Sequence, residues 1–314
     1  MATGRLVFLL AGLALIVLLT VGCDLQPAEP PIVPSRESLP TRTPTSAPKP
    51  SPVETATPDL STDPAQWRPA SRGIPAQVGV AGVAVAPSDP LVIYLAAYEP
   101  GGIYRSDDGG QTWHSASGRL ETLAPITLAV HPEDRDLAWV GTAAGAYRTL
   151  DGGQSWYLMT DLPPVPIYAV AASPDGAGVY AGGEAAEVWR SEDGGQTWSF
   201  DSLAGTVTSV LSLAVAGNGT AYAGTAGQGV WASHDVGESW QRIGDALASA
   251  HVTVLHPVKE GHLYALAGGH LHFSRDGGDT WDAIGPDRFE VLSFAVGLPG
   301  SERIYLGSNG NALA

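Results

Sequence analysis

The chain from about residue 78 onward repeats one alternation of apolar and polar segments. A run of Val, Leu, Ile, Ala and Phe is followed by a short turn and then by a second run with an aromatic residue at a fixed place. Near-continuous apolar runs of this length predict strands that are buried on both faces. The predicted first strands are Val78–Ala86, Ile126–Val130, Ile167–Ala172, Val210–Ala216, Val252–Leu255 and Leu292–Val296.

Each predicted first strand leads into a turn and a second strand. The turns, rich in Pro, Asp and Gly, are at 87–90, 131–134, 173–176, 217–219, 256–259 and 298–300. The aromatic residues of the second strands are Tyr94, Trp139, Tyr180, Tyr222, Tyr264 and Tyr305. A third strand follows, as in Ile103–Arg105, Ala146–Arg148 and Val188–Arg190. Because this aromatic residue occurs six times, we expect six repeats.

An octet ends the third strand in five of these repeats. Its pattern is hydroxyl, any residue, Asp, any residue, Gly, any residue, hydroxyl, Trp. The five copies are Ser106–Trp113, Thr149–Trp156, Ser191–Trp198, Ser233–Trp240 and Ser274–Trp281. Their tryptophans lie 43, 42, 42 and 41 residues apart, a period that indicates an array of supersecondary units.

The residue types in the octet predict a hairpin turn. A short Asp side chain accepts hydrogen bonds from nearby backbone N–H groups, and Gly supplies the positive φ that a reversal needs. The Trp ring places a large apolar surface in the layer below. The residues that repeat in the octet are thus sufficient to close a hairpin. We expect these residues to be structural: Asp108, Trp113, Asp151, Trp156, Asp193, Trp198, Asp235, Trp240, Asp276 and Trp281.

The octet resembles the Asp-box, or BNR repeat, of sialidase-like β-propellers. Four short strands in about 42 residues also match one propeller blade. The resemblance implies an all-β fold: a single propeller of six four-stranded blades, with the Asp-box hairpins between third and fourth strands. The glycine-rich Asp-Gly-Gly-Gln-Thr-Trp form is most similar to bacterial BNR-repeat proteins of the photosystem II assembly-factor type and to sortilin-type repeats.

The sixth repeat has no Asp-box of its own. Residues 66–69 (Gln-Trp-Arg-Pro), followed by 73–75 (Gly-Ile-Pro), resemble the fourth strand and exit loop that follow an Asp-box. We therefore expect the last blade to be closed by strands from the N-terminal and C-terminal parts of the chain. Such a closure would remove the open sheet edges that promote aggregation.

The N-terminal segment predicts export and lipid attachment. Arg5 precedes the apolar run Leu6–Leu19, and Thr20-Val21-Gly22 leads to Cys23, the one cysteine of the chain. This order is typical of a lipoprotein signal peptide over residues 1–22, with Cys23 as the lipidated residue; a plain signal peptide or an uncleaved anchor is the alternative. We expect an extracytoplasmic protein anchored to a bacterial cell membrane.

A polar linker separates this signal from the repeats. Residues 23–65 are crowded with Pro, Ser and Thr and lack apolar periodicity, which predicts a disordered stalk. Residues 66–314 then form the predicted propeller domain. The formal net charge of −16 argues against nucleic acid as a partner.

Candidate binding residues are those that break the repeat. In the sialidase-like family, ligands meet the loops from fourth to first strand and from second to third strand, on the face away from the Asp-boxes. The resemblance places on that face Arg72, Glu99, Arg119, Glu121, Asp161, Glu184, Glu187, Asp201, Asp245, His251, His270, Asp287, Arg288 and Glu290. His131 and His256 repeat in equivalent turns, so we expect them to be structural.

Two classes of function remain open. The favoured hypothesis is a non-catalytic module that binds a protein, peptide or glycan. The resemblance to the assembly-factor and sortilin types implies a protein or peptide, since both types bind such ligands. The alternative is a sialidase-like or xyloglucanase-like glycoside hydrolase, in which Arg72, Arg119 and Arg288 bind a carboxylate or two acids act as a catalytic pair. The histidines of the fifth repeat cluster in sequence, but their spacing favours a structural role, and we predict no metal and no cofactor.

Overall fold

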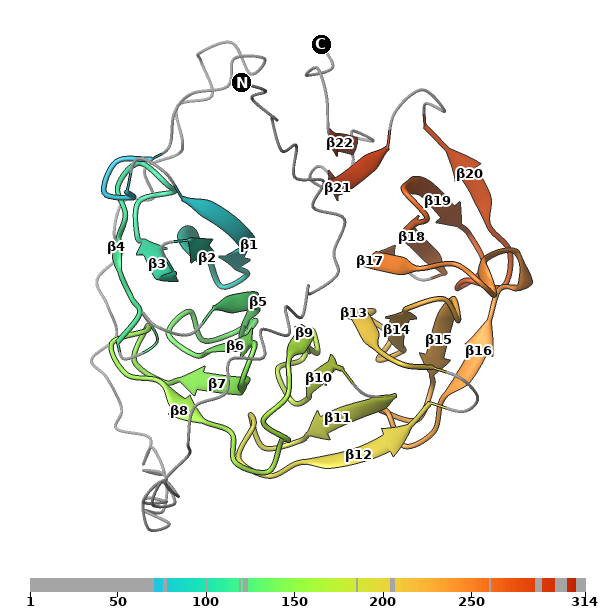
Figure 1. Cartoon of the computed structure of the whole chain (residues 1–314), viewed down its shortest axis with the longest axis horizontal. Coiled ribbons are helices and arrows are strands. Elements are labelled where there is room, and N and C mark those ends of the chain that lie inside the picture. Colours follow the sequence, from blue (N-terminus) through green and yellow to red (C-terminus); the bar gives the residue numbers. More distant parts are fainter. Residues whose placement is uncertain are drawn as a thin grey trace, which may run out of the picture. The chain divides into compact units, whose positions relative to one another are not determined.

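The computed structural model describes residues 71–75, 78–99, 101–118, 120, 124–184, 186–203, 207–259, 261–285, 290–296 and 304–308. The chain divides into the units 1–54 and 55–314, and every described residue belongs to the second. That unit is built from antiparallel sheets (Figure 1). The predicted signal peptide with Cys23, the stalk and residues 66–70 lie outside the described residues.

Five sheets have four strands each, in sequence order from the innermost to the outermost. The first contains β1 (Gly79–Ala86), β2 (Asp89–Glu99), β3 (Gly102–Ser106) and β4 (His114–Ser115). The second contains β5 (Pro125–Val130), β6 (Ala138–Thr142), β7 (Gly145–Thr149) and β8 (Tyr157–Leu158). The third contains β9 (Ile167–Ala172), β10 (Val179–Gly183), β11 (Glu187–Ser191) and β12 (Ser199–Ser202).

The fourth sheet contains β13 (Val210–Val215), β14 (Ala221–Thr225), β15 (Val230–Ser233) and β16 (Gln241–Ile243). The fifth contains β17 (Val252–Lys259), β18 (His262–Ala267), β19 (His270–Ser274) and β20 (Asp282–Ile284). The first strands β1, β5, β9, β13 and β17 are neighbours in that order, and the sheets stand around a common centre as propeller blades (Figure 1).

The sixth repeat forms a two-stranded sheet in the described part of the chain. Its strands are β21 (Val291–Val296) and β22 (Ile304–Ser308), and β21 contacts β18 of the fifth blade. The described residues therefore form five four-stranded blades, not the six predicted. The difference has a simple origin, because the segments expected to supply the other two strands of the sixth blade lie outside the described residues.

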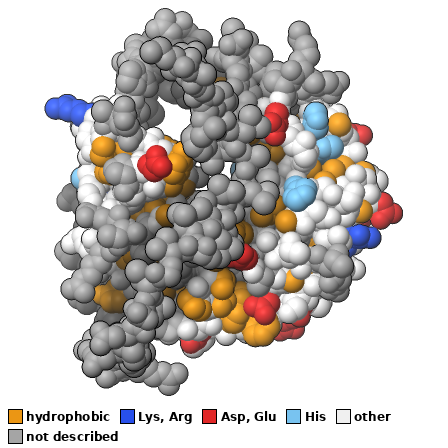
Figure 2. All heavy atoms as spheres, in the orientation of Figure 1, with side chains coloured by type: hydrophobic (Ala, Val, Ile, Leu, Met, Phe, Trp, Pro, Cys, Tyr) orange, Lys and Arg blue, Asp and Glu red, His pale blue; other side chains and the backbone are white. Residues whose placement is uncertain are grey.

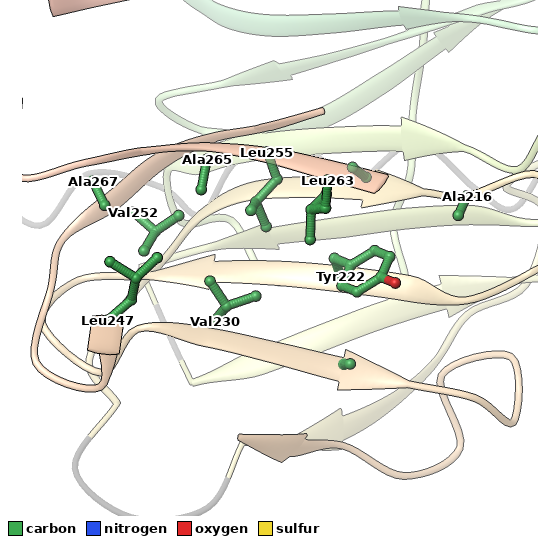
Figure 3. Packing of buried hydrophobic residues seen from close by; sticks show 11 residues of the cluster. Ala216, Tyr222, Val230, Leu247, Val252, Leu255, Leu263, Ala265 and Ala267 are labelled. Atoms are coloured by element: carbon green, nitrogen blue, oxygen red, sulfur yellow. The ribbon is translucent and has the colours of Figure 1, made fainter. Parts of the chain in front are cut away.

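Apolar clusters between successive blades make the core. Figure 3 shows the cluster between the fourth and fifth blades, where Val230 and Leu247 of one blade meet Val252, Leu255 and Leu263 of the next. Equivalent clusters join the first blade to the second, the second to the third and the third to the fourth. At about 25 cal/mol per Å² of buried apolar surface, this face-to-face burial is the main stabilising term of the fold.

The predicted strands correspond to the observed ones, with two corrections. The turn predicted at 87–90 is partly strand, because β2 begins at Asp89, which pairs with Ala86 of β1. The turn predicted at 256–259 is strand, because β17 continues to Lys259 and pairs there with His262 of β18. The chain reverses instead beside Gly261, whose φ of 72° suits a tight turn. A 3-10 turn spans Asp245–Leu247, and no helix among the described residues is long and apolar enough to cross a membrane.

Candidate functional site

Each Asp-box closes its own hairpin. In the third blade, the Ser191 hydroxyl donates to Oδ1 of Asp193 at 2.8 Å and accepts the backbone N–H of Gly195 at 2.7 Å. Asp193 also accepts the backbone N–H of Thr197 at 2.9 Å and its hydroxyl at 2.7 Å. The same bonds recur around Asp108, Asp151, Asp235 and Asp276.

These hydrogen bonds stabilise the ionised carboxylates. The Thr112 hydroxyl, followed by the Thr112 backbone N–H, lowers the pKa of Asp108 to about 2. Thr280 acts in the same way on Asp276 and lowers its pKa to about 2. Each of these carboxylates already accepts hydrogen bonds inside its own hairpin. The Asp-box aspartates therefore have little acceptor capacity left for a ligand.

Arginines from the third strands bind the next Asp-box along the ring. Nη1 of Arg148 donates to the carbonyl of Gly194 at 2.6 Å, and Nη1 of Arg190 donates to the carbonyl of Val236 at 2.9 Å. The Arg105 side chain is buried, lies against Gly152 and bonds Asp136 of the second blade at 2.7 Å. We call these three contacts the arginine latches; they fasten the first four blades in sequence.

Arg105 has the most complete set of partners. Besides Asp136, it donates to Asp107 at 2.7 Å and to the hydroxyl of Tyr94 at 2.7 Å. Burial opposes ionisation of Arg105, but the bonds with Asp107 and Asp136 outweigh it and raise its pKa. Burial likewise raises the pKa of Tyr94 to about 12, so the phenol stays protonated and donates to the carbonyl of Arg135 at 2.8 Å.

The opposite ends of the strands carry a repeated hydrogen bond. The turn between second and third strand donates a backbone N–H to the carbonyl of the residue that precedes the first strand. We call these turns and the residues before the first strands the face frame. Its bonds are Ala143 to Ala124 at 3.3 Å, Glu184 to Pro166 at 3.0 Å, Ala226 to Ser209 at 3.1 Å and Gly268 to His251 at 3.1 Å.

The side chains on this face frame differ from blade to blade. Glu184 occupies the place of Ala143 and Ala226, and His251 occupies the place of Ala124 and Pro166. The backbone therefore repeats while the chemistry changes, which is how a propeller face acquires a specific surface. Figure 2 shows separate acidic side chains on one face of the molecule and histidines grouped over the fifth blade.

The fifth blade brings three of the predicted residues to one turn. His251 and Glu290 both contact the Gly268–Gly269 turn: Gly268 bonds the His251 carbonyl, and a Cβ at Gly269 would lie 2.7 Å from Cγ of Glu290. His270 follows directly as the first residue of β19. Both glycines have positive φ, 58° and 79°, so the turn needs residues without a side chain there.

Other predicted residues lie at the same end of the strands but in different blades. Glu99 ends β2, opposite Gly79. Glu187 begins β11, opposite Ser202. Asp161 and Asp245 lie in the exits of the second and fourth blades, Asp245 within the 3-10 turn. Asp201, which was predicted in a loop, lies within strand β12 opposite Val188, because the pairing with β11 extends that strand to Ser202.

Arg72 lies in the described segment 71–75, which precedes the first blade. Its carbonyl accepts the backbone N–H of Trp113 at 2.8 Å, which places its backbone beside the Asp-box of the first blade. Arg119, Glu121, Asp287 and Arg288 lie outside the described residues. The arginine triad of the glycosidase hypothesis therefore has one described member, and the structure brings no second arginine of that triad to it within the described part.

Sequence reasoning passed over Tyr168, the second residue of β9. Burial raises the pKa of Tyr168, and the negative charge of Glu184 adds to the effect. A hydroxyl-bearing aromatic residue in an otherwise apolar first strand was the available signal. Because the charge of Glu184 acts on Tyr168 from the neighbouring turn, we include Tyr168 in the face frame of the third blade.

His131 and His256 pack between blades. Nε2 of His131 lies 3.1 Å from the carbonyl of Gly176 in the third blade, and its Nδ1 accepts a backbone N–H from Glu133. His256 meets Phe294 of β21 edge to face, with ring centroids 6.3 Å apart. Among the described residues, no group of three or more His, Cys, Asp or Glu side chains is arranged to hold a metal ion.

Comparison with known proteins agrees with this geometry. A family model described as the BNR/Asp-box repeat matches residues 104–115, which span the third strand and Asp-box of the first blade. The chain is a β-propeller, and its first blade carries the BNR/Asp-box repeat. A search of curated proteins finds no match to this Asp-box propeller.

Solved propellers of several kinds resemble the chain. An ancestral GH74 enzyme is 23% identical with a TM-score of 0.56, over 69% of this chain and 32% of the enzyme. YCF48 bound to D1 peptide is 20% identical with a TM-score of 0.54, over 69% of this chain and 72% of YCF48. The WD40 repeats of RRP9 are 14% identical with a TM-score of 0.59, over 76% and 75%. At these identities the similarity establishes the fold alone, and the Asp-box propeller spans about a third of the GH74 enzyme's length.

Proposed function

We propose that this Asp-box propeller is a non-catalytic binding module that recognises a protein, peptide or glycan ligand on its face frame. The observation that carries the proposal is the constant backbone frame with changing side chains, Glu184 and Tyr168 in the third blade and His251, His270 and Glu290 around the fifth. A rigid scaffold that displays variable side chains on loops is typical of recognition surfaces.

The solved relatives support a binding role without defining the ligand. YCF48, a propeller of similar fold, has been solved with a D1 peptide. The fold also hosts enzymes, so the argument for binding rests on the side chains of the frame rather than on the fold. Separate carboxylates and imidazoles on one face are suited to hydrogen bonds and ion pairs with a partner.

The binding proposal predicts a selective effect of face substitutions. The full chain is screened against a glycan array and a random peptide library, and the strongest binder becomes the probe. We expect a Glu184→Gln, His251→Ala variant to weaken binding of that probe by about tenfold or more, the scale of one or two lost polar contacts. Titration by calorimetry measures the change.

A matched variant provides the control. Glu133→Gln removes the same charge from a turn at the Asp-box end of the second blade, where Glu133 is exposed. It should leave the affinity unchanged. An equal loss in the Glu133 variant, or no loss in the face variant, would contradict the assignment of the face frame as the binding surface.

A glycoside hydrolase is the second candidate. Acids at one end of the strands, among them Glu99, Glu184 and Glu187, provide the carboxylates that such chemistry requires, and a GH74 enzyme has a similar fold. Release of fluorophore from a sialoside or β-glucan probe by the full chain, abolished by Glu187→Gln, would establish catalysis and overturn the binding module.

The proposed module is extracytoplasmic and tethered. Cys23 follows the apolar run and the small residue Gly22, and a Pro-rich stalk of residues 23–65 leads to the propeller. A palmitate analogue fed to expressing bacteria should label the chain and not a Cys23→Ser variant. Unchanged labelling in that variant would refute the lipid anchor.

We infer that the complete ring has six blades. The register of the sixth sheet is that of a blade: Ser293 pairs with Gly307 after a bulge, as Thr127 pairs with Gly141 in the second blade. Phe294 of β21 also contacts Tyr264 of the fifth blade, with ring centroids 6.1 Å apart. The sixth repeat thus starts a blade in the same orientation as its neighbours.

A further inference from the structure

A β-bulge interrupts the described first strands at the same register. In the second blade, Pro125 pairs with Thr142 and Thr127 pairs with Gly141. Ile126 stands between these two pairs, outside the ladder of the second strand. The same break recurs in the other repeats, and the bulged residues are Ala81, Ile126, Tyr168, Leu211, Thr253 and Leu292. We call these six residues the bulge row. A bulge re-aims a side chain, so its repetition directs one side chain per blade in the same way.

Close packing fixes the backbone at the bulges. A Cβ at Gly141 of the second blade would lie 2.6 Å from the carbonyl oxygen of Ile167, which precedes the bulge of the third blade. A Cβ at Gly224 of the fourth blade would lie 2.7 Å from the carbonyl oxygen of Val252, which precedes the bulge of the fifth. The Ser212 hydroxyl also donates to that Val252 carbonyl at 3.2 Å. The bulged side chains are therefore held by a rigid part of the fold rather than by a loop.

The bulge row lies outside the packing between blades. The residue before each bulge is buried in a cluster between blades, as Ile167, Val210 and Val252 are. Among the described residues, those clusters contain no member of the bulge row. The contrast is clear in the sixth sheet, where Leu292 is 48% exposed and the preceding Val291 is 4% exposed. Side chains of the bulge row are thus available for contact with a ligand.

The bulge row runs along the inner edge of the face frame. The first strands are the innermost strands of the sheets and stand around the common centre (Figure 1). In each of the second to sixth repeats, the bulged residue comes two residues after the frame residue that precedes the first strand, as Ile126 follows Ala124. The row presents three aliphatic side chains, Ile126, Leu211 and Leu292, and the ring of Tyr168. It is therefore mainly apolar.

The face frame beside this row is acidic. Among the described residues, its turns and the residues next to them contain no lysine or arginine, but they contain Glu99, Glu184, Glu187 and Glu290. The described lysines and arginines lie elsewhere. Three form the arginine latches, Arg135, Lys259 and Arg275 lie at the Asp-box end of the strands, Arg242 is on the outer strand β16, and Arg72 precedes the first blade. The frame therefore attracts cationic groups and repels anionic ones.

We propose that the bulge row and the acidic face frame together bind an extended basic peptide segment of a protein partner. An apolar side chain of the peptide lies on the bulge row, and flanking Lys or Arg side chains pair with Glu184 and Glu290. The proposal rests on the binding function proposed above and narrows its ligand to one class. Because the apolar side chains come from successive blades, the ligand must present apolar and cationic groups along its length, as an extended peptide does. Apolar contact supplies affinity, and the carboxylates supply selectivity.

Three pools of short synthetic peptides test this ligand class on the full chain. The first pool has Leu, Phe or Tyr at the centre and Lys or Arg on both sides. The second replaces Lys and Arg by Glu, and the third keeps Lys and Arg but has Ser at the centre. We expect the first pool to bind about tenfold more tightly than either of the others, as measured by fluorescence anisotropy.

Substitutions separate the apolar part of the site from the charged part. Leu211→Ser removes apolar surface, so binding of the first pool should weaken about fivefold at both low and high salt. Glu184→Gln removes a charge, so binding should weaken about fivefold at low salt and much less at high salt. A variant that is merely destabilised does not produce this difference. Leu292→Ser repeats the apolar test at a side chain that is already half exposed, with little disturbance of packing.

Leu158→Ser is the matched control. Leu158 is 49% exposed on the outer strand β8, away from the bulge row. The substitution makes the same change of side chain as Leu211→Ser, and it should leave binding of the first pool unchanged.

Several results would overturn the proposal. Equal binding of the three pools would exclude a basic peptide as the ligand. Unchanged binding in both Leu211→Ser and Leu292→Ser, or an equal loss in Leu158→Ser, would exclude the bulge row as its site. Self-association of the chain that is lost in Leu211→Ser would identify a second copy as the occupant. A glycan or acidic peptide whose binding depends on Glu184 and His251 would refute this inference and leave the binding module in place.

Discussion

At the scale of single residues, the Asp-box of the fourth blade contains an unfavourable backbone position. Val236 has φ of 62°, and the equivalent residues are Gly109, Gly152, Gly194 and Gly277, with φ between 69° and 76°. For an L-residue with a branched side chain, the left-handed region costs about 1–2 kcal/mol. The Val236 carbonyl still accepts the arginine latch from Arg190, so the hairpin keeps its form despite the cost.

Relieving this strain should stabilise the protein. We expect Val236→Gly to raise the free energy of unfolding by about 1 kcal/mol, less than the full strain because Gly also gains freedom in the unfolded chain. The reverse change at the equivalent site, Gly194→Val, should cost about 1–2 kcal/mol. Urea denaturation followed by Trp fluorescence measures both, and a destabilised Val236→Gly would refute the strain.

At the scale of elements, blades are joined by apolar clusters and arginine latches. Each latch requires an Arg in the third strand of a blade, and the first, second and third blades have one. The fourth and fifth blades have Ala232 and Phe273 at that position and therefore no latch of this kind. Phe273 stacks on Tyr264 with ring centroids 4.6 Å apart. At this place the interface with the sixth sheet is therefore aromatic, whereas the first three interfaces of the ring carry an arginine.

Removing a latch should weaken the interface that it spans. Arg105→Ala leaves Asp136 and the Tyr94 hydroxyl without their partner, and we expect a loss of about 2 kcal/mol, reduced from the value for fully buried pairs because Asp136 is partly exposed. Arg242→Ala, on the exposed outer strand β16, should change stability by less than about 0.5 kcal/mol. Equal effects in thermal unfolding would contradict the latch.

At the scale of the whole molecule, five Asp-boxes set the response to acid. The pKa of each of the five carboxylates is lowered, and those of Asp108 and Asp276 fall from 3.8 to about 2. Between these values the unfolded chain binds more protons than the folded one. Stability is therefore fully present above pH 3.8 and is lost as the pH falls towards 2.

Acid unfolding should accordingly follow the Asp-boxes. Near pH 5 these carboxylates are ionised in both the folded and the unfolded chain, so they should not change the thermal unfolding midpoint with pH. From pH 4 to pH 2 we expect the midpoint, measured by circular dichroism, to fall steadily. Asp193→Asn removes one of the five titrating groups and should make that decline shallower. A midpoint that does not change below pH 4 would show that the hairpin bonds do not favour the ionised carboxylates.

The sequence by itself determined the repeat, the strand order and the hairpin chemistry. These are local properties: the Asp193 hydrogen bonds close within one octet, and apolar runs such as Ile167–Ala172 report their own burial. The Pro at 257 misled the turn prediction, because strand pairing with β18 extends β17 through it.

Only the tertiary structure decided what meets across blades. The Gly268–Gly269 turn brings His251 and Glu290 together, and the Arg72 carbonyl accepts a hydrogen bond from Trp113. Such contacts depend on how neighbouring blades twist and stack, which no period in the sequence encodes. The reason is physical: a repeat specifies its own backbone, whereas a surface between repeats exists only once the ring has assembled.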